Sequence, residues 1–95
     1  MEILDDSRKE TGWIIAVIEG RVCEAKVYDQ PSPWGIDRGR VHRLMVLRKQ
    51  KTPIPRTFYE SFDFYYSREL IRNELPPEVL EKILLELEAL PLAGG

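Results

Sequence analysis

The sequence is poor in the residues that build reactive centres. Its 95 residues include one cysteine, Cys23, and one histidine, His42. They exclude an intrachain disulfide and are too few for a cysteine–histidine zinc site. The phosphate-loop pattern GxxxxGK(S/T), the dinucleotide-binding pattern GxGxxG and the hydrolase pattern GxSxG are missing as well. We therefore expect no enzymatic activity, no metal and no cofactor.

Long apolar runs are also missing. No stretch approaches the roughly 18 apolar residues of a membrane span. The first ten residues lack the hydrophobic segment of a secretory signal. With 43% hydrophobic and 32% charged residues, the composition is that of an ordinary globular protein. We expect a cytoplasmic protein with one domain over residues 1–95, in which residues 1–11 form a flexible arm.

Charge is distributed unevenly along the chain. Between Pro31 and Thr57 there are seven basic residues and one acidic residue, whereas the remainder has seven basic and fifteen acidic residues. The small net charge of −2 therefore hides a basic middle and acidic flanks.

Two β-branched runs, 13–18 and 22–28, predict a hairpin. Gly20-Arg21 between them is typical of a type II′ turn, in which Glu19 would pair with Val22 and Ala16 with Ala25. One face then carries only apolar or small residues: Ile14, Ala16, Ile18, Cys23, Ala25 and Val27. The other carries Trp13, Ile15, Val17 and Tyr28 together with Glu24 and Lys26. We expect the first face to be the core.

Two further strands are predicted at 40–48 and 56–66. The first has two alternative inward sets: Val41, Met45 and Leu47, or Leu44 and Val46. A bulge near His42-Arg43 would reconcile the two sets. In the second, Phe58, Phe62, Phe64 and Tyr66 share one face, and Tyr59, Ser61, Asp63 and Tyr65 share the other.

The last predicted element is a helix over residues 76–90, with proline in its first turn. Its apolar stripe consists of Leu80, Ile83, Leu84, Leu87 and Leu90, with Leu85 alone on the far side. Residues 67–74 form one or two helical turns in this interpretation. The expected fold is α+β: a four-stranded, mainly antiparallel, meander-like sheet over 13–66, with the C-terminal helix packed on one face.

The stretch between the second and third strands is the first candidate for an interaction loop. Pro31 and Pro33 fix their own φ, and we expect Gly35 and Gly39 to adopt positive φ in a tight return. The candidate residues are Pro31, Ser32, Trp34, Gly35, Ile36, Gly39 and Arg40.

The same stretch carries a resemblance. The run YDxPSxxGIxxGRVxxL, from Tyr28 to Leu44, resembles the core of an uncharacterised family of short bacterial and phage proteins. The resemblance implies a strand hairpin, this loop, further strands and a C-terminal helix. It implies no activity and no catalytic residue.

A second candidate is an anion-binding series, Arg38, Arg40, Arg43 and Arg48. Arginines beside Trp34 and several tyrosines suit phosphate contacts and base stacking. The competing interpretation is a solvated sheet edge on which charge prevents edge-to-edge pairing. We favour the edge because the domain as a whole is acidic, unlike most nucleic-acid-binding domains. An acidic protein partner is the intermediate option.

His42 and Cys23 are weaker candidates. His42 could in principle form an acid–base pair with Asp29, Ser32 or Asp37, but an ordinary strand histidine is the preferred interpretation. Cys23 is expected to behave as an inert core residue.

The third candidate is the sheet face that one helix leaves uncovered. Its residues Trp13, Ile15, Val17 and Tyr28 predict a two-fold dimer, unless the 1–11 arm or residues 67–74 cover them. The preferred function is thus a non-enzymatic accessory or protein-interaction module of bacterial or mobile-element origin. A nucleic-acid-associated module that uses the basic segment 38–56 is the alternative, and an enzyme ranks third. The expected partner is another protein or a second copy, not a membrane.

Overall fold

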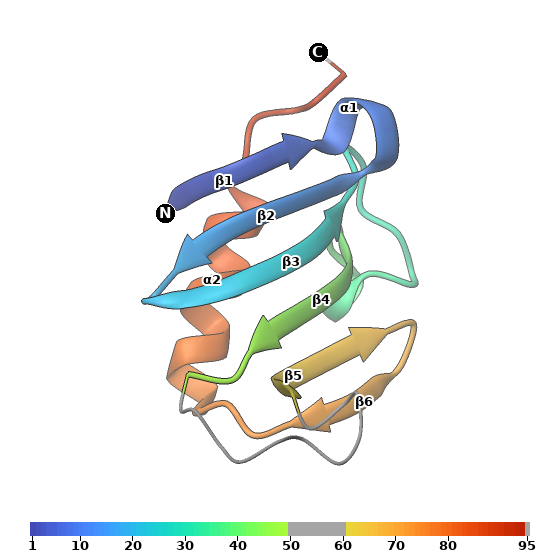
Figure 1. Cartoon of the computed structure of the whole chain (residues 1–95). Helices are drawn as coiled ribbons and strands as arrows, with labels where there is room; N and C mark the ends of the chain where they lie inside the picture. Colours follow the sequence, from blue (N-terminus) through green and yellow to red (C-terminus); the bar gives the residue numbers. More distant parts are fainter. Residues whose placement is uncertain (50–60, 95) are drawn as a thin grey trace.

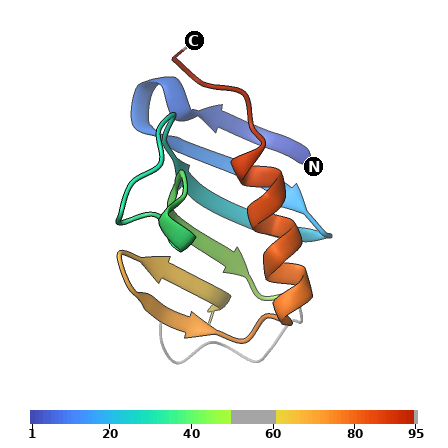
Figure 2. The ribbon, with the colours of Figure 1, turned by 180° about the vertical axis from the view of Figure 1, so that it is seen from behind.

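An antiparallel sheet forms one layer of the protein, and one long helix forms the other (Figures 1 and 2). The computed structural model describes residues 1–49 and 61–94. Its six strands are β1 (Glu2–Ser7), β2 (Trp13–Ile18), β3 (Arg21–Val27), β4 (Val41–Leu47), β5 (Phe62–Ser67) and β6 (Leu70–Asn73). The helical elements are α1 (Arg8–Thr11), η1 (Ile36–Arg38) and α2 (Pro77–Glu88). The strands follow one another across the sheet in chain order, which confirms an antiparallel sheet with a C-terminal helix.

The sheet has six strands, so the expectation of four was wrong. The two additional strands are its edges: β1 occupies the stretch expected as a flexible arm, and β6 replaces the helical turns expected over 67–74. An edge strand needs backbone hydrogen bonds to only one neighbour. All side chains of β1 are exposed except the half-buried Ser7. Such a strand leaves no apolar alternation in the sequence by which it could be found.

The β2–β3 turn differs from the predicted one. Glu19 (φ 53°) and Gly20 (φ 71°) both adopt positive φ, as in a type I′ turn, and Ile18 pairs with Arg21. Ala16 consequently lies opposite Cys23 instead of Ala25. This shift of two residues leaves every side chain on its predicted face, because the side-chain period of a strand is two.

The imperfect alternation of β4 is resolved by a bulge. Lys26 pairs with Arg43 but Val27 pairs with Val41, which leaves His42 as the extra residue. Val41, Leu44 and Val46 are therefore all buried. The predicted bulge at His42-Arg43 is confirmed, and it combines members of both inward sets.

The core lies between the sheet and α2. The apolar hairpin face is buried as predicted, and Ile83 and Leu87 of α2 pack against it. Leu85 is 63% exposed, which confirms the predicted phase of the helix. Phe62 and Phe64 of β5 are also buried. The remaining part of the predicted fourth strand, with Phe58, Tyr59 and Glu60, lies outside the described residues.

Candidate binding surfaces

The loop between β3 and β4 is fixed to the end of α2 by Arg40. Its guanidinium donates hydrogen bonds to the carbonyl oxygens of Tyr28, Glu88 and Leu90, each at 2.8 Å. The carboxylate of Glu88 in turn accepts the backbone N–H groups of Arg40 (2.8 and 3.1 Å) and Val41 (3.2 Å). The last turn of α2 contains no basic residue. Arg40 therefore supplies the positive charge that helix C-termini favour.

The two glycines of the loop are required for space, and the expectation of positive φ was wrong. Gly35 and Gly39 have φ of −71° and −97°, while Asp37 (53°) and Arg38 (58°) make the tight return. A Cβ on Gly35 would collide with the backbone of Gly39, and one on Gly39 would collide with the Glu88 carboxylate. The loop is thus closely packed against itself and against α2.

The backbone of Trp34 is fixed by hydrogen bonds, whereas its side chain is exposed. Its N–H donates to Ser32 Oγ at 3.1 Å, and its carbonyl oxygen accepts from the Tyr66 hydroxyl at 3.2 Å. The Trp34 residue is nevertheless 64% exposed. The loop therefore displays a large aromatic ring on a positioned backbone.

Beside Trp34 lies a small cavity of about 130 Å³, which we name the basic pocket. It is lined by Lys26, Tyr28, Trp34, His42, Arg43 and Arg68. Lys26 and Arg43 lie directly opposite each other on β3 and β4, and Arg68 comes from the β5–β6 turn. In the described parts of the chain none of these three cations forms an ion pair with a carboxylate.

His42 is one of the residues that line the basic pocket. Its ring meets that of Tyr28 edge-on at 4.4 Å, and its Nε2 lies 3.1 Å from Ser32 Oγ. Burial, followed by the charge of Lys26, lowers the pKa of His42 below its usual range. Of the three partners that the sequence offered, only Ser32 contacts His42. Within the described residues no carboxylate hydrogen-bonds to the ring.

The other two predicted partners of His42 lie elsewhere. The Asp29 carboxylate accepts the backbone N–H groups of Ala93 (2.8 Å) and Gly94 (2.9 Å), and these hydrogen bonds lower the pKa of Asp29. Asp29 therefore holds the C-terminal tail. Asp37 lines a second cavity, beside α2.

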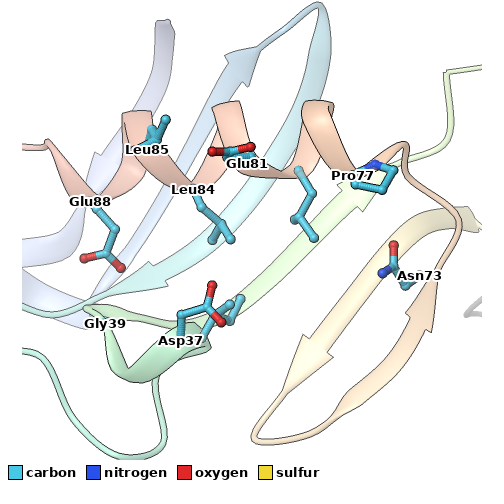
Figure 3. Close-up of a pocket in the computed structure, with 10 residues that line it drawn as sticks. Asp37, Gly39, Asn73, Pro77, Glu81, Leu84, Leu85 and Glu88 are labelled. Carbon is cyan, nitrogen blue, oxygen red and sulfur yellow. The ribbon is translucent and has the colours of Figure 1, made fainter.

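This second cavity, which we name the acidic groove, has a volume of about 530 Å³ and lies between α2 and the loop (Figure 3). It is lined by Ile36, Asp37, Gly39, Asn73, Pro77, Leu80, Glu81, Leu84, Leu85 and Glu88. Figure 3 shows Leu84 and Glu88 directed from the helix toward the loop, and Asp37 directed back toward the helix. Leu85 points away from the loop and forms the outer rim. Apolar walls with carboxylates at the margin thus characterise this groove.

The loop between β3 and β4 lies within a segment that matches a protein-family model. Residues 12–63 match the model of the DUF7678 family, a domain of unknown function, and this segment is more than half of the chain. The chain belongs to the DUF7678 family. No curated protein and no solved structure matches the chain. An uncharacterised family was expected from the motif between Tyr28 and Leu44, and that motif falls inside the matched segment.

The DUF7678 segment contains most of the basic pocket and a smaller part of the acidic groove. All lining residues of the pocket except Arg68 lie within residues 12–63. Of the groove, the segment contributes Ile36, Asp37 and Gly39, whereas α2 lies beyond it.

The four arginines of the predicted anion-binding series do not lie together. Arg40 is bound to α2, and Arg48 pairs with Asp63 and Glu74, each at 3.4 Å. Arg38 is exposed in η1, and Arg43 alone lines the basic pocket. The other two cations of the pocket, Lys26 and Arg68, were not among the predicted residues. The pairing register across the bulge would have placed Lys26 beside Arg43, but Arg68 sits in a turn that was not foreseen.

The predicted dimer residues lie in two places. Trp13, Ile15 and Val17 share the sheet face that α2 leaves uncovered, and each is half-buried. Tyr28 lies beyond the end of β3, in the basic pocket, and is 39% exposed.

Cys23 is 1% exposed, and burial raises the pKa of its thiol to about 12, as fits a core residue. Among residues 1–49 and 61–94, no three histidine, cysteine, aspartate or glutamate side chains are grouped to hold a metal ion. The described helices include none with the length and apolar character of a membrane span.

Proposed function

We propose that this DUF7678 domain is a protein-interaction module that binds a short segment of a partner in the acidic groove. The observation that carries the proposal is the composition of that groove, in which a leucine-lined helix faces an aspartate-bearing loop. Its volume of about 530 Å³ lies in the range of cavities that hold ligands. The resemblance of the Tyr28–Leu44 motif supports a bacterial or mobile-element origin for the module.

The apolar part of the groove is continuous with the core. Ile36, Leu80 and Leu84 are half-buried and pack against the core, so their outer surfaces are held in place. Burying an apolar side chain against them removes apolar surface from water on both partners. The segment therefore brings at least one large apolar side chain.

The charged part of the groove selects for cations. Asp37 and Glu81 are exposed, and neither forms an ion pair among the described residues. Glu88 is already occupied by the N–H groups of Arg40 and Val41. Two carboxylates thus remain for Lys or Arg side chains that flank the apolar residue.

A peptide selection tests this proposal. Random peptides displayed on phage are selected on the immobilised domain, and an enriched peptide is synthesised for calorimetry. We expect a large apolar residue within a few positions of Lys or Arg. The double variant Asp37→Asn/Glu81→Lys should bind the peptide about tenfold more weakly, because each exposed pair contributes up to about 1 kcal/mol. Asparagine is chosen at position 37 because it tolerates positive φ.

Two controls make the result specific. Glu10→Lys changes an exposed carboxylate of α1, outside the groove, and should leave the affinity unchanged. A peptide whose Lys and Arg are replaced by Glu should recover affinity for the double variant. Selected peptides that bind wild type and the double variant equally would contradict the groove as the site.

Self-association through the uncovered sheet face is the second proposal. Ile15 and Val17 form part of an apolar strip, with Glu2 and Asp5 in register at the β1 edge and Arg72 at the β6 edge. A two-fold axis parallel to the strands would lay β1 of one copy over β6 of the other. Glu2 and Asp5 of each copy would then lie near Arg72 of the other copy, although Arg72 already pairs with Glu74 of its own chain at 2.8 Å.

Sedimentation velocity at micromolar concentration tests this second proposal. We expect a dimer for wild type and for Leu92→Glu, which changes an exposed leucine of the C-terminal tail. Ile15→Glu places a charge in the strip and should give a monomer. A monomeric wild type would refute the dimer without affecting the groove.

A further inference from the structure

We propose that the basic pocket binds the phosphate of a nucleotide unit while the adjoining base stacks on Trp34. This site goes beyond the proposed protein-interaction function. It is built by the β3–β4 bulge, the loop and the β5–β6 turn, and it shares no lining residue with the acidic groove.

The arrangement of charge indicates an anion. Lys26 and Arg43 lie directly opposite each other on neighbouring strands, and like charges in that position destabilise a sheet. Arg68 adds a third cation to the same pocket, from a position with a φ of 64°. Among residues 1–49 and 61–94 these three cations have no carboxylate partner, in a protein whose net charge is −2, and they form a site that an anion would complete.

The dimensions and polarity of the pocket indicate a phosphate. A cavity of about 130 Å³ is too small for a whole nucleotide but suits one compact anionic group. Arginine presents a planar fork that matches phosphate oxygens, and lysine adds a point charge. Lys26 and Arg43 both occupy the sheet face opposite α2, because each is adjacent to a residue that is buried beneath the helix. The phosphate would therefore approach from the side of the sheet away from the groove, so nucleotide binding and the proposed dimer would compete for this face.

Trp34 provides the surface for the base. The backbone N–H and the carbonyl oxygen of Trp34 are both hydrogen-bonded, whereas the residue as a whole is 64% exposed. Because this backbone is already ordered, little further conformational entropy is lost when a base stacks on the ring. An exposed aromatic ring next to cations is the combination with which single-stranded nucleic acids are bound.

A nucleotide unit can come from a free nucleotide or from a single strand, and both carry the same chemistry. The open position of Trp34 leaves room for a strand to continue beyond the stacked base. Duplex DNA keeps its bases stacked on one another and offers only its phosphates. Single strands should therefore bind more tightly than either duplex or mononucleotide.

Binding is measured with the whole protein and four probes: fluorescein-labelled oligothymidylate, the corresponding duplex, AMP and orthophosphate. We expect saturable anisotropy with the single strand, quenching of tryptophan fluorescence, and an affinity that falls with salt. Trp34→Ala should weaken single-strand binding about tenfold, because stacking on an aromatic residue contributes substantially to each bound base. Tighter binding of AMP than of the oligonucleotide would identify a free nucleotide as the source of the same chemistry.

The chain supplies a matched pair of variants. Arg38 and Arg68 are both exposed and both have positive φ, 58° and 64°, but only Arg68 lines the pocket. Arg68→Asn and Arg38→Asn therefore make the same chemical change in the same backbone conformation. We expect Arg68→Asn to weaken binding about fivefold. It should also reduce the slope of log K against log salt by about 0.7.

Three results would overturn the proposal: no saturable binding of any nucleotide probe, equal losses in Arg38→Asn and Arg68→Asn, or orthophosphate binding without tryptophan quenching by any nucleotide. Because Trp34 and Arg68 are exposed, circular dichroism of the variants should match wild type. The peptide affinity of the groove provides an independent check that these variants remain folded.

Discussion

The acidic groove and the basic pocket share one loop but are built in different ways. The groove uses the outer edge of the helical stripe that also forms the core, so its apolar wall follows from a sequence periodicity. The pocket uses a strand bulge and a turn, which bring Lys26, Arg43 and Arg68 together from three separate segments. The basic middle of the sequence contributes Asp37 to the groove. Of its arginines, Arg48 pairs with Asp63, and the guanidinium of Arg40 is occupied by carbonyl oxygens at the end of α2. Charge along the chain therefore does not translate directly into charge on a surface.

The largest expected effect distinguishes the buried side of α2 from its exposed side. Leu87 is 1% exposed and Leu85 is 63% exposed. Leu87→Ala should lower the free energy of unfolding by about 2–5 kcal/mol, because it leaves a cavity in the core. Leu85→Ala should change it by less than about 0.5 kcal/mol. Urea melts measure both variants, and equal losses would show that α2 does not have a buried side at Leu87 and an exposed side at Leu85.

The second largest effect should be a change in the shared loop that weakens binding at both sites. A Cβ on Gly35 would collide with the backbone of Gly39, so Gly35→Ala must distort the loop that carries Asp37 and Trp34. We expect a loss of about 1–3 kcal/mol in stability and weaker binding at both sites. Gln30→Ala, at an exposed position of the same loop, serves as the control. Calorimetry that finds one site intact in Gly35→Ala would show that the two sites do not depend on a common loop conformation.

Salt should distinguish the two sites. Raising the salt concentration fourfold should weaken oligonucleotide binding about tenfold, because phosphate contacts release counterions. Peptide binding to the groove should fall by less than about threefold, because apolar burial carries most of it. Parallel titrations of one protein sample measure both affinities. A groove with the steeper salt dependence would reverse the proposed assignment of the two surfaces.

The smallest effect concerns pH and His42. Burial lowers the pKa of His42, so its contribution to stability is complete above the unfolded pKa of about 6.5 and declines as the pH falls below it. The protonated ring would add a cation beside Lys26. Between pH 7.5 and 5.5 we expect slightly lower stability but severalfold tighter oligonucleotide binding. His42→Gln should remove this pH dependence of binding, whereas the groove, which contains no histidine, should show none in either protein. Tighter binding at low pH in His42→Gln would exclude His42 as the titrating group.

The sequence was most informative where side chains are buried in a regular pattern. The strand hairpin, the buried set of α2 and the bulge at His42 follow from alternation with a period of two or of 3.6 residues. The edges of the sheet were missed because β1 exposes nearly all its side chains and β6 most of them. The turn at Glu19-Gly20 was misplaced by one residue because glycine is compatible with either turn type.

For the candidate sites, sequence alone identified Trp34 and Arg43 as a suitable aromatic and a suitable cation, and the 28–40 stretch as a shaped loop. Only the tertiary structure decided which charges remain available. The sequence predicted that Arg40 binds an anion, but its guanidinium donates hydrogen bonds to the carbonyl oxygens at the end of α2. Arg68 joins the site through the turn between β5 and the edge strand β6. Periodicity is a local property that the chain carries in its order of residues. The pairing of charges depends on which segments meet in space, and that is fixed only when the sheet and the helix pack together.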